Sequence, residues 1–254
     1  MSQIGAQPVL VEGPALKQYG TGALAQLDVV EVSTGVLDAT WRSDAETSEN
    51  KVLEYEEETG LDVVDKVQLE ELTLADGFGF SFYRREYLPI PAAGRQDEQL
   101  ARTRRRFDLW ESYGVEQALA THLDTAAIDV GTVSDSEEGL AALLAASVDA
   151  FPWVPTVHTG RPAGVLIQRR GSAKASGVLL VVGSGYGTSD DADAFTGRMY
   201  LTGPVQIRRG PVVEAQAVDA VNNRIDTLIE REYFIVLDGP AYRVDVRFAT
   251  EDAP

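Results

Sequence analysis

The sequence predicts an α+β fold, and three features of the chain support that class. Residues 96–123 contain no internal proline and are long enough for a helix of about 40 Å. Within residues 199–237, apolar or β-branched residues recur at every second position, the period of half-buried strands, and Gly-Pro pairs separate the segments; the alternating positions are Val205 and Ile207, then Ile225, Thr227 and Ile229. Predicted helices and strands do not alternate strictly along the chain, which favours α+β over an alternating α/β arrangement.

Composition limits the classes of protein that the chain can belong to. It has 254 residues, of which 44% are hydrophobic, enough to bury a substantial core in one large domain or two small ones. It contains no apolar run of membrane-spanning length, and the first residues lack the regions of a signal peptide, so we expect it to stay in the cytoplasm of the producing cell. The absence of cysteine excludes disulfides, thiolate nucleophiles and cysteine metal sites.

The chain is strongly acidic, with 40 acidic residues, 22 basic residues and a formal net charge of −18. Such a surface repels phosphate at long range, which argues against sequence-specific binding of DNA or RNA. Two interpretations remain open. The chain is an ordinary acidic soluble protein, or it belongs to a container that holds nucleic acid without adhering to it.

The first third of the chain has few residues that could form a core of their own. Residues 1–30 form an arm interrupted by Gly and Pro, and residues 35–74 are strongly acidic with short strand-like pieces. We expect the second segment to be a long extended loop or hairpin. Such a loop is stable only if another surface receives it.

The middle of the chain contains the predicted helices. An aromatic strand at residues 78–83 precedes the long helix of residues 96–123, whose apolar stripe includes Phe107 and Trp110. A capping-box pattern at residues 134–137 predicts the start of a second helix that stops before Pro152. A short helix is expected after Pro162, and residues 177–182 read as a buried strand.

No pattern in the chain indicates catalysis, and we predict no enzyme activity, cofactor or metal. His122 and His158 lack metal-ligand spacing, and the glycine-rich loop 183–187 fails both the nucleophile-elbow and the dinucleotide patterns. The carboxylates at residues 54–58 and 190–193 do not match a calcium loop and are expected to be exposed.

One cluster of side chains is a candidate for contacts between subunits. The long helix carries arginines on a polar face, and the segment after residue 53 is rich in glutamate. Arginine binds carboxylates in bidentate geometry, so the arginines can pair with the acidic loop of a neighbouring molecule. A solvated helix face and phosphate contact are the alternatives. The candidate contact residues are Arg102, Arg104, Arg105, Arg106, Glu54, Glu56, Glu57 and Glu58.

Several short motifs carry a resemblance to a known family. They are residues 107–119, residues 155–159 (Pro-Thr-Val-His-Thr), the loop 183–187 (Gly-Ser-Gly-Tyr-Gly), and residues 200–205 followed by 208–212. Together with the order of arm, extended loop, aromatic strand, long helix, second helix and β-rich end, they resemble the Hong Kong 97-type major capsid proteins of tailed bacteriophages. The local likenesses are to capsid proteins of actinobacterial phages.

The resemblance implies a Hong Kong 97-type capsid fold with named parts. These would be an N-terminal arm (1–30), an extended loop (31–77), a peripheral domain (78–135) with the spine helix (96–123), an axial domain (136–210) and return strands of the peripheral domain (211–254). It also implies hexamers and pentamers of one chain that form an icosahedral head around double-stranded DNA.

The same resemblance implies partners and a location. They are further copies of the chain, a portal, possible decoration proteins and packaged DNA contacted without sequence specificity, in a virion assembled in the host cytoplasm without a membrane. Some members begin with a cleaved scaffolding segment; the sequence shows no sign of one, so a separate scaffolding protein is expected. Some members crosslink a loop lysine to an asparagine, but with few candidates such as Lys51, Lys66 and Asn50, we expect non-covalent assembly.

Three alternatives remain. An encapsulin-like nanocompartment shell would share the fold but enclose an enzyme cargo. Another phage structural component, such as a tail or connector protein, would form rings or tubes. A carboxylate-dependent hydrolase would need a pocket with two carboxylates at a defined separation, for which the sequence has no motif.

Overall fold

The structure is a computed structural model that describes residues 22–33, 76–89, 95–148, 150, 154–186 and 196–247. Most of the predicted arm and extended loop, including Glu54, Glu56, Glu57 and Glu58, and the acidic segment 190–193 lie outside these residues. Within the described part, the chain forms two five-stranded sheets, one long helix and four shorter ones.

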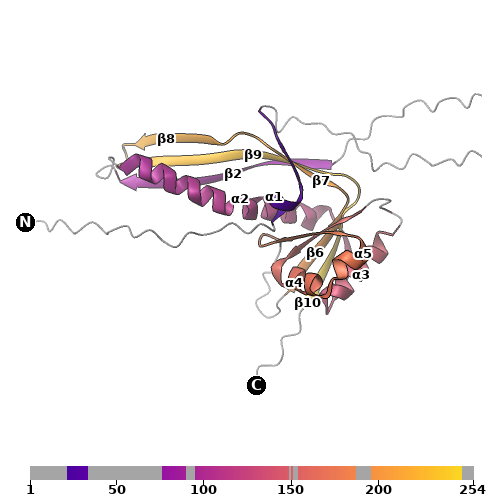
Figure 1. Cartoon of the computed structure of the whole chain (residues 1–254). Helices are drawn as coiled ribbons and strands as arrows, with labels where there is room; N and C mark the ends of the chain where they lie inside the picture. The colour runs from indigo at the N-terminus through magenta and orange to yellow at the C-terminus, as the bar shows by residue number, and fades with distance from the viewer. Residues whose placement is uncertain are drawn as a thin grey trace, which may run out of the picture.

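The first sheet is built around one long strand. Strand β9 (Arg224–Leu237) pairs along its whole length with antiparallel β2 (Asp76–Pro89). On its other side, β7 (Val205–Arg209) pairs with one half of β9 and β8 (Val213–Asp219) with the other, while β1 (Asp28–Glu31) extends the sheet beside β7. Strands β8, β9 and β2 form a long ribbon that projects from the rest of the molecule (Figure 1). We call these three strands the ribbon.

The long helix α2 (Gln96–Ala126) lies along one face of the ribbon (Figure 1). Alternation in β2 places Phe78, Phe80 and Phe82 at partly buried positions and leaves Tyr83 63% exposed. Phe82 packs against Phe107 of the helix with ring centroids 5.2 Å apart. The aromatic strand that the sequence predicts is therefore the strand that receives the helix.

The second sheet has the order β3-β10-β6-β4-β5. Its strands are β3 (Ile128–Val133), β10 (Tyr242–Arg247), β6 (Thr196–Thr202), β4 (Thr156–Gly160) and β5 (Leu179–Gly183). One face of this sheet packs against α3 (Ser136–Ala146) and α4 (Arg161–Arg170), and the short α5 (Ser172–Ser176) follows α4. Leucine and valine side chains buried between the helices and the sheet form one core.

The other face of the second sheet contributes to a core shared with the ribbon. Val181 of β5 and Tyr200 of β6 belong to the same buried cluster as Val115 and Leu119 of α2 and Ile235 of β9. The short helix α1 (Ala23–Gln26) adds Ala23 to this cluster. The end of α2 is therefore the point at which the two sheets meet.

The helices differ from the sequence expectations in three details. Helix α2 ends at Ala126 rather than at residue 123. Trp110, which the sequence pattern places in the apolar stripe, is 49% exposed, because the buried positions follow Phe107, Glu111, Val115 and Leu119 at intervals of four. The capping residue of helix α3 is Asp135, the second residue of the predicted capping box, and not the first. Its side chain accepts a hydrogen bond from the backbone N–H of Glu137 at 2.6 Å.

Each of the two sheets draws strands from all three of the segments 78–135, 136–210 and 211–254, and the division of the chain into these parts stays a prediction. Strand β3 lies in the first of these segments and β10 in the third, and the two pair with each other in the second sheet. Strand β7, grouped with the preceding segment, pairs with β9 of the first sheet. Strands β3 and β10 are more than a hundred positions apart in sequence, so composition along the chain does not reveal their pairing.

Candidate functional site

The exposed face of the predicted spine helix carries the four candidate arginines, and the structure divides them into two pairs. Arg104 donates two hydrogen bonds of 2.7 Å to the carboxylate of Glu214 on β8. Arg106 contacts Glu86 of β2 at 2.5 Å. Both arginines therefore fasten α2 to the ribbon within one chain.

Arg102 and Arg105 have no hydrogen-bonded or ion-paired partner among the described residues. Both side chains are exposed. Arg102 contributes to the lowered pKa of nearby Glu98, after the larger effect of a hydrogen bond from Arg95. Because the candidate glutamates lie outside the described residues, pairing between these arginines and a neighbour's acidic loop stays a prediction.

A second contact between α2 and the ribbon is buried. Glu111 is 7% exposed and accepts hydrogen bonds from Arg231 at 2.8 Å and from the hydroxyl of Tyr233, both on β9. Burial raises the pKa of Tyr233 above its usual value, and the charge of Glu111 adds to this effect. The carboxylate is therefore held between a cation and a phenol, which fixes the position of the helix along β9.

A third contact joins α2 to segments remote in sequence. The carboxylate of Glu116, 1% exposed, accepts hydrogen bonds from the backbone N–H of Ala23 at 3.0 Å and of Gly185 at 2.8 Å, and from the Ser112 hydroxyl at 3.1 Å. The backbone at Gly185 comes so close that a Cβ there would lie 2.6 Å from the carbonyl oxygen of Tyr113. Glu116 thus holds α1 and the loop after β5 against the helix.

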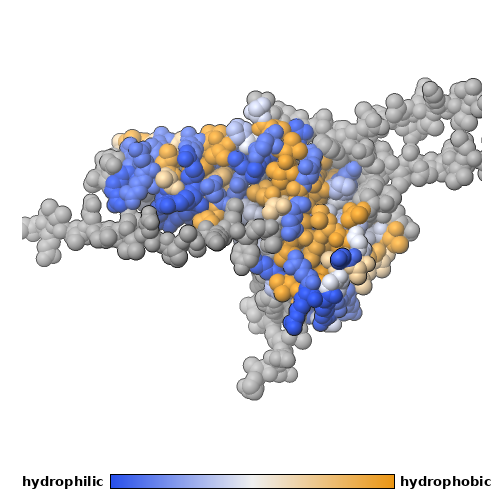
Figure 2. Space-filling view, in the orientation of Figure 1, coloured by the Kyte–Doolittle hydropathy of each residue, from blue (hydrophilic) through white to orange (hydrophobic). Residues whose placement is uncertain are grey.

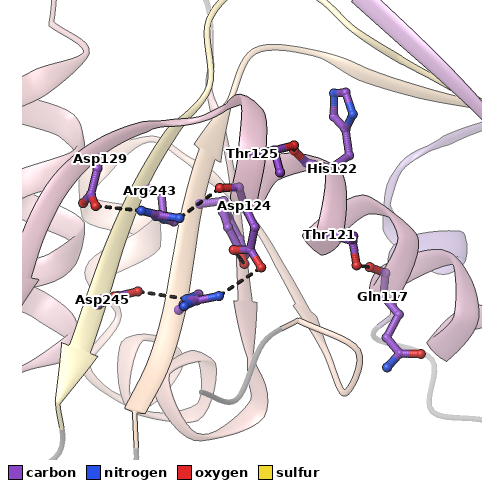
Figure 3. A network of polar contacts seen from close by, with 10 residues as sticks. Gln117, Thr121, His122, Asp124, Thr125, Asp129, Arg243 and Asp245 are labelled. Carbon is purple, nitrogen blue, oxygen red and sulfur yellow. Dashed lines mark hydrogen bonds and ion pairs between the residues drawn. The ribbon is translucent and has the colours of Figure 1, made fainter. Parts of the chain in front are cut away.

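A network of ion pairs surrounds the end of α2, where it meets the second sheet (Figure 3). Asp124 accepts hydrogen bonds from Arg198 at 2.9 Å and from the Tyr200 hydroxyl at 2.7 Å, both on β6. Arg198 also contacts Asp245 of β10 at 3.1 Å.

Arg243 of β10 extends this network to the start of β3. It donates to the backbone carbonyl of Asp124 at 3.0 Å and to the carboxylate of Asp129 at 2.6 Å (Figure 3). Its hydrogen bond lowers the pKa of Asp129. Strands β6, β10 and β3 are therefore all tied to the end of the helix, which sets the angle between the ribbon and the second sheet.

The remaining buried polar cluster is structural in character. His158 is fully buried, with one ring nitrogen 3.2 Å from the Tyr186 hydroxyl and the other 2.9 Å from the Thr202 hydroxyl. Burial lowers the pKa of His158 to about 3, so the ring stays neutral near pH 7 and is a poor general base. Among the residues that the structure describes, no group of three His, Cys, Asp or Glu side chains is arranged to hold a metal ion.

Sequence reasoning missed Glu111 and Glu116 as buried anchors. A signal for Glu111 was present, because it lies four residues from both Phe107 and Val115 in the apolar stripe, where an acidic residue requires a partner. The sequence offers no comparable signal for Asp124 or Arg198, whose contacts depend on how the second sheet is assembled. No described helix combines the length and the apolar character that crossing a membrane requires.

Comparison with known proteins gives matches of structure only. No family model and no curated protein matches the sequence. The fold is similar to that of the capsid of Ralstonia phage GP4, with a TM-score of 0.54 and 8% identity over 99% of this chain and 98% of that chain. It is similar to a virus-like particle from Pyrococcus furiosus, with a TM-score of 0.53 and 12% identity over 89% and 92% of the two chains.

A further similarity is to the holo-SrpI encapsulin complex of Synechococcus elongatus PCC 7942. The TM-score is 0.52 and the identity is 11%, over 100% of this chain and 99% of that chain. At these identities the likeness establishes the fold and nothing more specific. The chain has the Hong Kong 97-type capsid fold, which confirms the predicted fold class.

Proposed function

We propose that the chain is the shell subunit of a closed icosahedral particle, the major capsid protein of a tailed double-stranded DNA bacteriophage. The observation that carries the proposal is the similarity to the Ralstonia phage GP4 capsid, which spans nearly the whole of both chains. The similar structures are a phage capsid and an encapsulin complex, so we assign a structural role rather than an enzymatic one.

The contacts within the chain support the role of a shell subunit. Helix α2 is fastened to the ribbon by Arg104, Arg106 and Glu111, and to the second sheet through Asp124 and Arg198. Several ionic and aromatic contacts thus hold the two parts in one relative orientation. A fixed angle between them is what repeated copies need in order to close a shell of constant curvature.

The charge of the chain is consistent with a container for DNA. A net charge of −18 opposes tight adhesion to phosphate, so packaged DNA would be contacted weakly and without sequence specificity. We assign self-association into hexamers and pentamers, together with a separate scaffolding protein, a portal and possible decoration proteins. Assembly would take place in the host cytoplasm, and the product would be a virion capsid.

A nanocompartment shell is the second candidate function. The similarity to the SrpI encapsulin complex favours it, since the coverage and TM-score match those for the phage capsid closely. The two candidates share the subunit fold and differ in what the shell encloses.

Electron microscopy of the purified protein with light scattering tests the proposal. Closed angular shells would support it, and a homogeneous monomer or dimer under all assembly conditions would overturn it. Nuclease treatment followed by extraction then separates the two candidates. Protected double-stranded DNA in particles from the native source indicates a phage capsid, whereas a single enclosed protein indicates a nanocompartment.

A further inference from the structure

Strand β8 forms an open edge of the ribbon. Among the described residues it pairs with β9 alone, and it is the outermost strand on that side (Figure 1). Its first six residues are exposed, with Val213 50% and Val218 67% accessible, and hydrophobic residues are visible along this border in Figure 2. An edge strand presents unpaired backbone N–H and C=O groups, which are a template for pairing with another strand.

The edge lacks the usual protection against such pairing. Strand β8 contains no lysine, arginine or proline. Its two acidic residues are neutralised within the chain, because Glu214 pairs with Arg104 and Asp219 contacts Arg224 at 3.2 Å. In a protein with a net charge of −18, this seven-residue edge therefore carries little net charge to repel a second copy.

The opposite edge of the ribbon is different. Strand β2 ends at Pro89, and its adjacent arginines at positions 84 and 85 contact Glu86 at 3.7 Å and Asp226 at 2.5 Å, respectively. Charged side chains and proline are the residues that natural edge strands use to discourage pairing. Strand β8 has no such proline, which makes it the edge better suited to self-association.

We propose that β8 pairs with β8 of a second copy of the chain in antiparallel register about a two-fold axis at Gln216. This register uses all seven residues, and it places Val213 opposite Asp219, Glu214 opposite Val218 and Ala215 opposite Ala217. No two like charges are directly opposite each other. The two ribbons then form one continuous six-stranded sheet across the contact.

The inference deepens the proposed function, on which it rests, by naming one self-association surface of the shell subunit. A two-fold contact is isologous, so one strand that is complementary to itself suffices to build it. In a closed shell, such contacts join neighbouring capsomers. Their strength comes chiefly from backbone hydrogen bonds, which the acidic surface does not weaken.

Cysteine crosslinking tests the contact directly, because the chain has no cysteine of its own. In the variant Gln216→Cys, the two new thiols face each other, and directly opposite residues of antiparallel strands have Cα atoms about 4.5–5.5 Å apart, within disulfide range. The matched control is Val221→Cys, which is 95% exposed but five residues from the axis. Val221 lies in the turn after β8, and even the last strand residue before it, Asp219, would lie about 20 Å from its copy, so the control thiols are out of disulfide range.

Mild oxidation of assembled particles, followed by non-reducing gel electrophoresis, should give a covalent dimer for Gln216→Cys and only monomer for Val221→Cys. If Gln216→Cys forms normal particles but gives only a monomer band on the gel, the proposed edge pairing is wrong and the shell function is unaffected. Failure to form particles would contradict the shell function alone. In that case, the concentrated soluble Gln216→Cys protein is oxidised instead. A covalent dimer would support the edge pairing, and a monomer would refute it.

A second test guards against a local effect of the first substitution, since the Gln216 side chain donates a hydrogen bond to Thr227 at 3.3 Å. Chains with Ala215→Cys and chains with Ala217→Cys are co-expressed, both positions being exposed. The proposed register predicts crosslinked dimers only when both chains are present, because identical cysteines would be offset by two positions and out of reach. Crosslinking of either variant with itself, or none in the mixture, contradicts this register.

Discussion

Substitution of Glu116 by alanine should destabilise the subunit and release two segments from α2. The side chain is 1% exposed and accepts the backbone N–H groups of Ala23 and Gly185. Without the carboxylate, both buried N–H groups lose their acceptor, at a cost of about 1–3 kcal/mol each. Relief of the burial cost of the carboxylate offsets part of this loss. We expect the free energy of unfolding to fall by about 2–4 kcal/mol.

Urea denaturation of the unassembled subunit, followed by circular dichroism, measures this change. The variant Glu116→Gln keeps one acceptor oxygen and should lose about half as much. The neighbouring substitution Gln117→Ala, at an exposed position, is the matched control and should change stability by less than about 0.5 kcal/mol.

Hydrogen exchange distinguishes the proposed role of Glu116 from general loosening of the core. The amides of Ala23 and Gly185 should exchange faster in Glu116→Ala by a larger factor than amides in the middle of β9, because only the first two lose their acceptor. Unchanged stability, together with unchanged protection of these two amides, would refute the assignment of Glu116 as the anchor of α1 and the loop after β5.

Two further predictions concern charge. If the exposed Arg105 contacts a neighbour, Arg105→Glu should reduce the particle yield and leave the urea midpoint of the subunit unchanged. Arg104→Glu should also lower the midpoint, because it places a second carboxylate beside Glu214. Normal shells from Arg105→Glu would exclude the contact with a neighbour. The lowered pKa of buried His158, about 3, means that the unfolded chain binds a proton below pH 6.5 that the folded chain does not. The contribution of His158 therefore makes the folded chain more stable as the pH rises from about 3 to 6.5, with a slope of up to about 1.4 kcal/mol per pH unit. Urea midpoints measured from pH 4.5 to 7 should show this slope, and His158→Gln should reduce it; an equal slope in the variant would contradict the assignment.

Local patterns in the sequence predict individual helices and strands, but they do not predict which strands pair. The alternating aromatics of β2 and the long proline-free segment of α2 each specify their own conformation through short-range periodicity. The pairing of β3 with β10 joins residues more than a hundred positions apart, and both strands have patterns that fit many partners. The assignment of strands to sheets therefore required the structure.

The arginine cluster shows the same limit for the candidate site. The sequence identified the exposed arginines of α2 and the chemistry of their partners, which is carboxylate. It did not identify Glu214 and Glu86 as partners, because each lies on a strand whose position beside the helix is set by the ribbon as a whole. Charge type is a local property of the chain, whereas the choice among many carboxylates is a property of the fold.

The contact between Arg104 and Glu214 links the arginine cluster to the proposed edge pairing. If the arginine served only to attract an acidic loop of a neighbour, its two short hydrogen bonds to Glu214 would compete with that function. If Arg104 instead serves to neutralise the exposed edge of β8, its two hydrogen bonds to Glu214 carry out that role directly. The second interpretation explains how a chain of net charge −18 can approach its own copy along this edge. It also predicts that replacing Glu214 with glutamine preserves the position-216 crosslink, whereas Arg104→Glu abolishes it.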